Sequence, residues 1–182
     1  MDRYISGDAH AFDELYSHAA PPLLSYLIRM SGRRALAEDV LQETFIKVHR
    51  ARSTYIAKSN PMPWLYAIAH RSFLDHARKH KRQKQKLEEV RSEAGNQHAH
   101  ITGVPGDQVH APDPEAAQAI RRALTKLAPP QRQAIVLCKL EGKTLAEAAE
   151  ITGTSVGAMK LRVHRGVARL RTLLSQGEHD GA

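Results

Sequence analysis

The sequence contains a single cysteine, Cys138, among its 182 residues. One cysteine excludes an internal disulfide and any zinc site built from several cysteines. Cys138 lies in the apolar stretch AIVLCKL, which predicts a buried and unreactive thiol. The chain also lacks HExxH, P-loop and GxSxG motifs and any convincing Asp, Glu and His metal cluster. We therefore expect a protein that is no enzyme and that holds neither cofactor nor metal.

Long apolar runs are also missing. No stretch approaches the roughly 20 apolar residues that a membrane-spanning helix needs. The opening residues, MDRYISGDAHAF, lack the basic start and apolar core of a signal peptide. We expect a cytoplasmic protein that does not insert into a membrane.

Acidic residues are too few to balance the basic ones. The 27 Lys and Arg outnumber the 19 Asp and Glu, which gives a net charge of +8. Such a charge favours a polyanionic partner, either nucleic acid or an anionic membrane. Because a basic protein can also have no such partner, the charge matters only where it is concentrated on one surface.

Helical periodicity dominates the chain, and no convincing strand pattern or internal repeat is present. We predict an all-α fold of two small helical domains, residues 1–82 and 113–182, joined by a flexible linker over 83–112. The linker is predicted from its few large apolar residues and its late Gly and Pro. Helices are expected over 36–52, from Pro63 onward, from Asp113 to about Leu127, and over 131–142.

The stretch TLAEAAEITGTSVGAMKLRVHRGVARLR, residues 144–171, predicts a helix-turn-helix. Thr144 and Glu147 fit a capping box, Gly153 suits the positive φ of a short turn, and Thr154 is the expected N-cap of the second helix. Candidate DNA contacts are Ser155, Ala158, Lys160, Leu161, Arg162, His164, Arg165 and Arg169. The predicted apolar face is Val156, Met159, Val163, Val167 and Leu170. The alternative is a solvated amphipathic helix, but turn spacing, capping box and one-signed charge coincide here.

Two features of residues 1–82 narrow the function further. Asp39, Gln42 and Glu43 share one helical face, which suits docking on a basic protein. Alternatively, Glu43 simply pairs with Lys47.

The stretch NPMPWLYAIAHRSFLDHARKHKRQKQK sets Trp64 beside a basic stripe that includes Arg71 and Arg78. Unpaired bases stack on aromatic side chains while cations hold the backbone, so this stripe suits single-stranded nucleic acid. A packing role for Trp64 is an equally good reading.

Together these motifs resemble the small extracytoplasmic-function (ECF) type of RNA polymerase sigma factor. The first match is AEDVLQETFIKVHRA followed by PWLYAIAHRSFLDHARKHKR, and the second is LAPPQRQAIVLCKLEGKTLAEAAEITGTSVGAMKLRVHRGVARLR. The two blocks cover both predicted domains in order. Leu161 departs from the family, which commonly has a small or polar residue there, and it suits contact with a thymine methyl group.

The resemblance implies roles for particular residues. Asp39, Gln42 and Glu43 would dock on a coiled coil of the largest polymerase subunit. The loop over 51–63 would capture a base flipped from the minus-ten element. The minus-ten contacts would be Asn60, Trp64, His70, Arg71 and Arg78, and the second helix of residues 144–171 would read the minus-thirty-five element.

The implied protein is a promoter-specificity subunit. It would bind core RNA polymerase and promoter DNA, be held inactive by an anti-sigma factor, and be a monomer when free. A polymerase-independent helix-turn-helix regulator is the alternative, although neither a sustained heptad nor a sensor domain is evident. A small nuclease is a third class, and the missing catalytic motifs argue against it.

Overall fold

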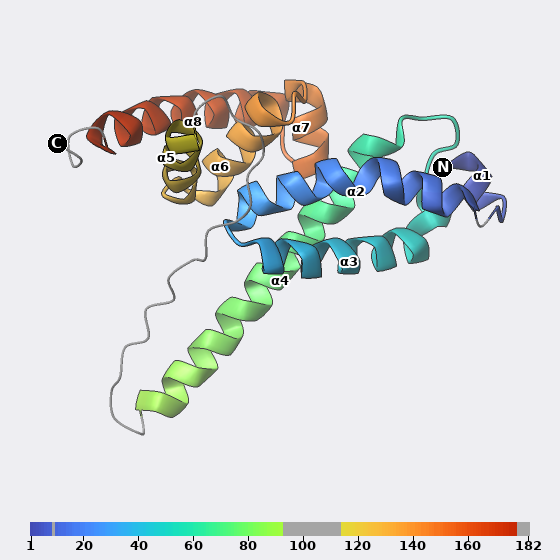
Figure 1. Cartoon of the computed structure of the whole chain (residues 1–182), viewed down its shortest axis with the longest axis horizontal. Coiled ribbons are helices and arrows are strands. Elements are labelled where there is room, and N and C mark those ends of the chain that lie inside the picture. Colours follow the sequence, from blue (N-terminus) through green and yellow to red (C-terminus); the bar gives the residue numbers. More distant parts are fainter. Residues whose placement is uncertain (9, 93–113, 178–182) are drawn as a thin grey trace.

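The structure, a computed structural model, describes residues 1–8, 10–92 and 114–177. Within these ranges every regular element is a helix, which confirms the predicted all-α fold. The helices form an amino-terminal unit, α1–α4, and a carboxy-terminal unit, α5–α8 (Figure 1). Most of the predicted linker lies outside the described residues. Helix α4 continues to Ser92, however, so the boundary predicted at residue 82 falls within a helix.

The amino-terminal unit begins with α1 (Asp2–Ile5), α2 (His10–Ser31) and α3 (Arg34–Ala51). Gly32 has φ +71° in the short turn that lets α2 and α3 lie antiparallel, side by side (Figure 1). Helix α2 runs through Pro21 and Pro22, although proline removes a hydrogen-bond donor from a helix interior. The flanking Leu23, Tyr26 and Leu27 are fully buried, and this burial favours a continuous helix.

A short 3₁₀ turn, η1 (Arg52–Thr54), and a loop lead into α4 (Pro61–Ser92). Asn60 caps α4, since its Oδ1 accepts the Met62 N–H at 3.0 Å. The helix therefore begins at Pro61 and not at Pro63 as expected. The first half of α4 packs against α2 and α3 through the buried residues Leu65, Tyr66 and Ala69. Its second half extends away from the other helices (Figure 1).

The carboxy-terminal unit comprises α5 (Pro114–Thr125), α6 (Pro129–Ile135), the π-helical turn η2 (Val136–Leu140), α7 (Leu145–Thr152) and α8 (Val156–Gly177). The predicted capping box is present: Thr144 Oγ1 accepts the Glu147 N–H, and the Glu147 carboxylate accepts the Thr144 N–H. Gly153 ends α7 with φ +64°, as expected. The N-cap of α8 was predicted wrongly. It is Ser155, whose Oγ accepts the Ala158 N–H at 3.1 Å, because α8 starts one residue later than expected.

The two units contact each other. Helix α4 packs on α7, and α2 packs on α5 and η2. The Arg132 guanidinium of α6 donates to the Met30 carbonyl of α2 at 2.8 Å. The sequence predicted two tethered domains but said nothing of this contact.

Candidate nucleic-acid interfaces and docking face

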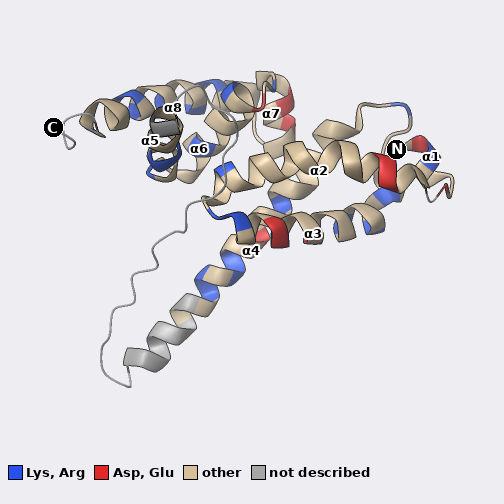
Figure 2. Ribbon diagram, in the orientation of Figure 1, with Lys and Arg blue, Asp and Glu red and all other residues tan. Residues whose placement is uncertain are grey.

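Helix α8 presents a basic outer surface. Among the predicted contacts, the exposed residues are Ser155, Lys160, Leu161, His164, Arg165 and Arg169. Ala158 and Arg162 are half-buried. Met159, Val163 and Val167 face the core as predicted, but Val156 is 49% exposed because it lies in the first turn, beyond the core. Five Lys or Arg and no Asp or Glu lie between Val156 and Gly177 (Figure 2). This surface suits the phosphates and base edges of a major groove.

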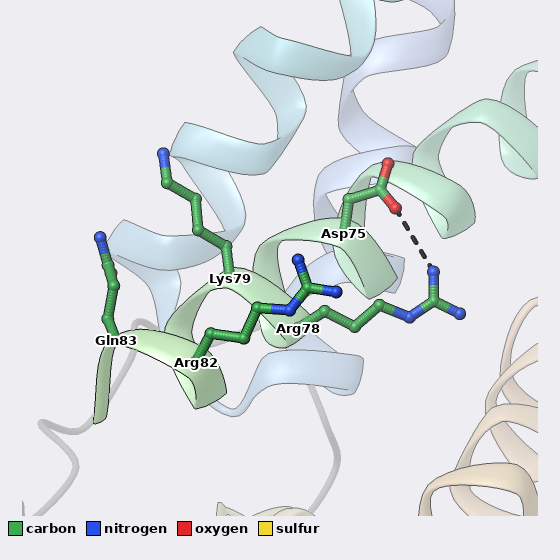
Figure 3. Close-up of a pocket in the computed structure, with 5 residues that line it drawn as sticks. All are labelled: Asp75, Arg78, Lys79, Arg82 and Gln83. Carbon is green, nitrogen blue, oxygen red and sulfur yellow. Dashed lines mark ion pairs between the residues drawn. The ribbon is translucent and has the colours of Figure 1, made fainter. Parts of the chain in front are cut away.

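Helix α4 carries a second basic surface. Arg71 and Arg78 are exposed, as predicted. Farther along, Arg78, Lys79 and Arg82 line an open concavity with Asp75 and Gln83 (Figure 3). Asp75 pairs with Arg78 at 3.6 Å and with Lys47 of α3 at 3.2 Å. Lys79 was absent from the predicted contacts, although it directly follows Arg78 in the stretch that predicted this surface.

The loop before α4 brings an aromatic side chain against the first turn of that helix. Tyr55 is buried and meets Trp64 edge to face, with ring centroids 5.6 Å apart. Trp64 is half-buried, so it packs within the unit and still reaches the surface. Lys58 has φ +62°, and its N–H donates to the Asp2 carboxylate at 3.0 Å. Ile56 is 77% exposed in this loop.

His70 does not lie on the surface where the sequence placed it. The residue is only 3% exposed, because position 70 falls on the inward stripe of α4 and Gln133 of the other unit covers it. The Tyr26 hydroxyl and the Gln133 amide nitrogen each lie 3.0 Å from Nδ1. Desolvation, with a smaller contribution from the charge of Arg71, lowers the His70 pKa to about 4. With the two units in contact, the His70 side chain is buried, so the predicted DNA contact of His70 would require the units to separate.

The predicted docking residues lie on one face of α3. Asp39 and Gln42 are exposed, and Glu43 is half-buried. Glu43 pairs with Lys47 at 3.0 Å, as the alternative reading expected. A surface pair of this kind contributes little to stability, so it leaves the face available to a partner.

A polar cluster joins the two units. The Glu141 carboxylate accepts from the Arg29 guanidinium and from the Tyr66 hydroxyl, the latter at 2.8 Å. Lys143 Nζ lies 4.6 Å from the centre of the Tyr66 ring. Desolvation and the Glu141 charge raise the pKa of Tyr66. The Glu141 side chain is only 6% exposed, so the cluster is a buried polar contact between α2, α4 and the segment after η2.

The described residues hold no group of three or more His, Cys, Asp or Glu that could bind a metal. Cys138 is half-buried, which is less than the sequence predicted, and desolvation raises the pKa of its thiol. In the same part of the chain, no helix is long and apolar enough to span a bilayer.

Comparison with known proteins decides the family. Residues 15–83 match Sigma-70 region 2, and residues 117–170 match Sigma-70, region 4. RNA polymerase sigma factor CarQ of Myxococcus xanthus is 36% identical over 178 residues, which cover 98% of this chain and 97% of CarQ. ECF RNA polymerase sigma factor SigF of Caulobacter vibrioides is 36% identical over 172 residues, covering 93% of this chain and 89% of SigF. The chain belongs to the ECF RNA polymerase sigma factors.

This ECF sigma factor also resembles a solved relative. The sigma factor RpoE of Bartonella quintana, crystallised with the anti-sigma factor NepR, superposes with a TM-score of 0.75 and 28% identity. The match covers 91% of this chain and 97% of RpoE. As an ECF sigma factor, the protein is a promoter-specificity subunit of RNA polymerase.

Proposed function

We propose that this ECF sigma factor reads two promoter elements with its two basic surfaces and docks on polymerase through α3. Helix α8 would bind the minus-thirty-five element as duplex, with Lys160, Arg165 and Arg169 near phosphates. Helix α4 and the loop before it would bind the minus-ten element as it opens. One observation carries the proposal: exposed cations gather on one helix in each unit, and the two units match regions 2 and 4.

The loop before α4 would assist in melting the minus-ten element. Taking one base out of the stack costs a few kcal/mol, which new contacts must offset. The Tyr55–Trp64 pair offers an aromatic surface, and Asn60 is exposed beside it. Because Asn60 Oδ1 already caps α4, its amide nitrogen is the group left for a base. Arg71 and Arg78 would hold the backbone of the opened strand.

The α3 face of Asp39, Gln42 and Glu43 would bind a basic surface of core polymerase. Reversing both charges, Asp39→Lys with Glu43→Lys, should weaken binding to core polymerase at least tenfold, because like charges then face each other. The side chains point outward, so circular dichroism should show an unchanged fold. Glu150→Lys, an exposed acid on α7, is the matched control and should bind normally. Undiminished core binding by the double variant would disprove this docking face.

The other partners follow from the same assignment. The Bartonella relative was solved with an anti-sigma factor, and we propose that this chain has a partner of the same class. The chain itself would perform no catalysis and would act as a monomer in the cell interior, where its promoters are.

Run-off transcription tests the whole proposal. The full chain with core polymerase should initiate at cognate promoters from its own genome, and core polymerase alone should not. A polymerase-independent regulator would instead bind duplex DNA tightly by itself and leave initiation by core polymerase unchanged. That second pattern would refute the proposed function.

A further inference from the structure

We propose that Gly157 and Leu161, one turn apart on α8, form an apolar ridge that reads thymine methyl groups in the upstream promoter element. The inference rests on the proposed function and adds a chemical class of base to it. Gly157 was not among the residues expected to contact DNA.

The outward face of α8 carries a largely apolar row. Met159 and Gly166 mark the buried side of α8, and residues 157, 161, 164 and 168 lie opposite them. Leu161, near the middle of this face, is 47% exposed, and Gly157 and Ala168 are exposed on either side along the helix. His164 is the polar member of the row. The row itself therefore offers a guanine base neither a guanidinium nor an ammonium group.

The helix-turn-helix contains three glycines, and the fold requires two of them. Gly153 is required by its φ of +64°. Gly166 is required by packing, because a Cβ there would lie 2.9 Å from Ile135 Cγ1 and 3.3 Å from the Gln131 carbonyl oxygen. Gly157 has neither reason: its φ is not positive, and a Cβ would meet no heavy atom of the described residues within 4 Å. A glycine that is unfavourable in a helix and unneeded by the fold indicates close approach of something outside the chain.

The charges beside the row favour DNA as that partner. Lys160 and Arg165 flank the row on its two sides, and α8 carries no acidic residue from Val156 to Gly177. Flanking cations bind phosphates and position the helix, while the side chains between them face base edges. The thymine methyl is the apolar group that the major groove displays. Gly157 would let the backbone come close enough for Leu161 to contact it.

The test uses the full chain with core polymerase. Promoters are first selected by initiation from a library randomised over the upstream element. Each thymine of the selected element is then replaced by uracil, which removes the methyl group and keeps the base pairing. At one or two positions this should weaken promoter binding about three- to fivefold, the change expected for one buried methyl group.

Variants link the effect to the ridge. Leu161→Ala should bind the thymine promoter about three- to fivefold more weakly and lose its sensitivity to uracil. Gly157→Ala should raise the melting temperature, because alanine favours a helix, and yet bind the promoter at least threefold more weakly. Ile120→Ala removes an exposed apolar side chain from α5 and should change neither promoter binding nor uracil sensitivity.

The outcomes separate the two claims. Initiation that ignores uracil at every position, or a selected element without A·T pairs, overturns the ridge and leaves the proposed function standing. Unchanged uracil sensitivity in Leu161→Ala, or full promoter binding by Gly157→Ala, also overturns it. A chain that never supports initiation by core polymerase overturns both.

Discussion

His70 is a titratable side chain enclosed between the two units. The Tyr26 hydroxyl and the Gln133 amide contact its ring, and Arg71 is its charged neighbour in the chain. The neutral ring fits this site, whereas a protonated ring would be a buried cation beside another cation. The residue therefore contributes through packing and hydrogen bonding, and we expect the contact between the units to weaken in acid.

The pKa of His70 is about 4 in the folded chain, below its ordinary value of 6.5. The unfolded chain therefore takes up the proton first as pH falls. This site's contribution to stability is complete above about pH 6.5 and is lost as pH falls from 6.5 toward 4, by at most about 1.4 kcal/mol per pH unit. Urea unfolding at pH 7, 6 and 5 measures it.

His70→Gln supplies the comparison, since an amide keeps hydrogen-bonding groups near Tyr26 and Gln133 but does not titrate. The variant should lose less stability than the wild type over this pH range. Parallel losses in the two proteins would show that other groups cause the acid sensitivity.

At the scale of elements, α7 sets the position of α8, the helix proposed to bind the upstream promoter element. Its capping box fixes the start of α7, and Gly153 ends α7 and begins the turn into α8. Thr144→Ala removes the acceptor of the Glu147 N–H and should destabilise the carboxy-terminal unit by about 1 kcal/mol. Amide hydrogen exchange along α7 reports the loss. Thr144→Ser keeps the hydroxyl and should retain most of the protection; equal loss in both variants would contradict a capping role.

At the scale of the whole molecule, the two units are held together by polar as well as apolar contacts. Glu141 accepts from Arg29 and Tyr66, which belong to the other unit. An interface that contains such groups separates more readily than a wholly apolar one, since water can solvate its polar groups again. This suits a subunit whose two basic surfaces are proposed to bind separate promoter elements.

Glu141→Ala should open the molecule, because it leaves the Arg29 charge and the Tyr66 hydroxyl without their shared acceptor. Small-angle X-ray scattering should then show a larger radius of gyration for the free chain, with unchanged helix content. Glu150→Ala, an exposed substitution on the neighbouring helix α7, should keep the compact value. If Glu141→Ala is as compact as the wild type, this cluster does not hold the units together.

Local chemistry was enough to predict much of this protein. The capping box at Thr144, the left-handed Gly153 and the inward side of α8 follow from propensity and periodicity, which act over a few residues. Helix starts shifted by one or two residues where a neighbouring side chain could cap instead, as Asn60 and Ser155 do. The exposed cations of α4 and α8 were predictable because charged side chains remain in water.

Other properties were decided only by the tertiary structure. The sequence alone determined an all-α chain with basic helices in two places, because these features depend on local spacing and charge. The contact between the two units helped to bury His70 and brought Glu141 to Tyr66. The packing of α8 left Gly157 without an internal neighbour among the described residues. Residues 63 to 75 positions apart meet in these contacts, and no local pattern encodes such a pairing. Burial depends on what packs on a helix face, and that partner comes from elsewhere in the chain.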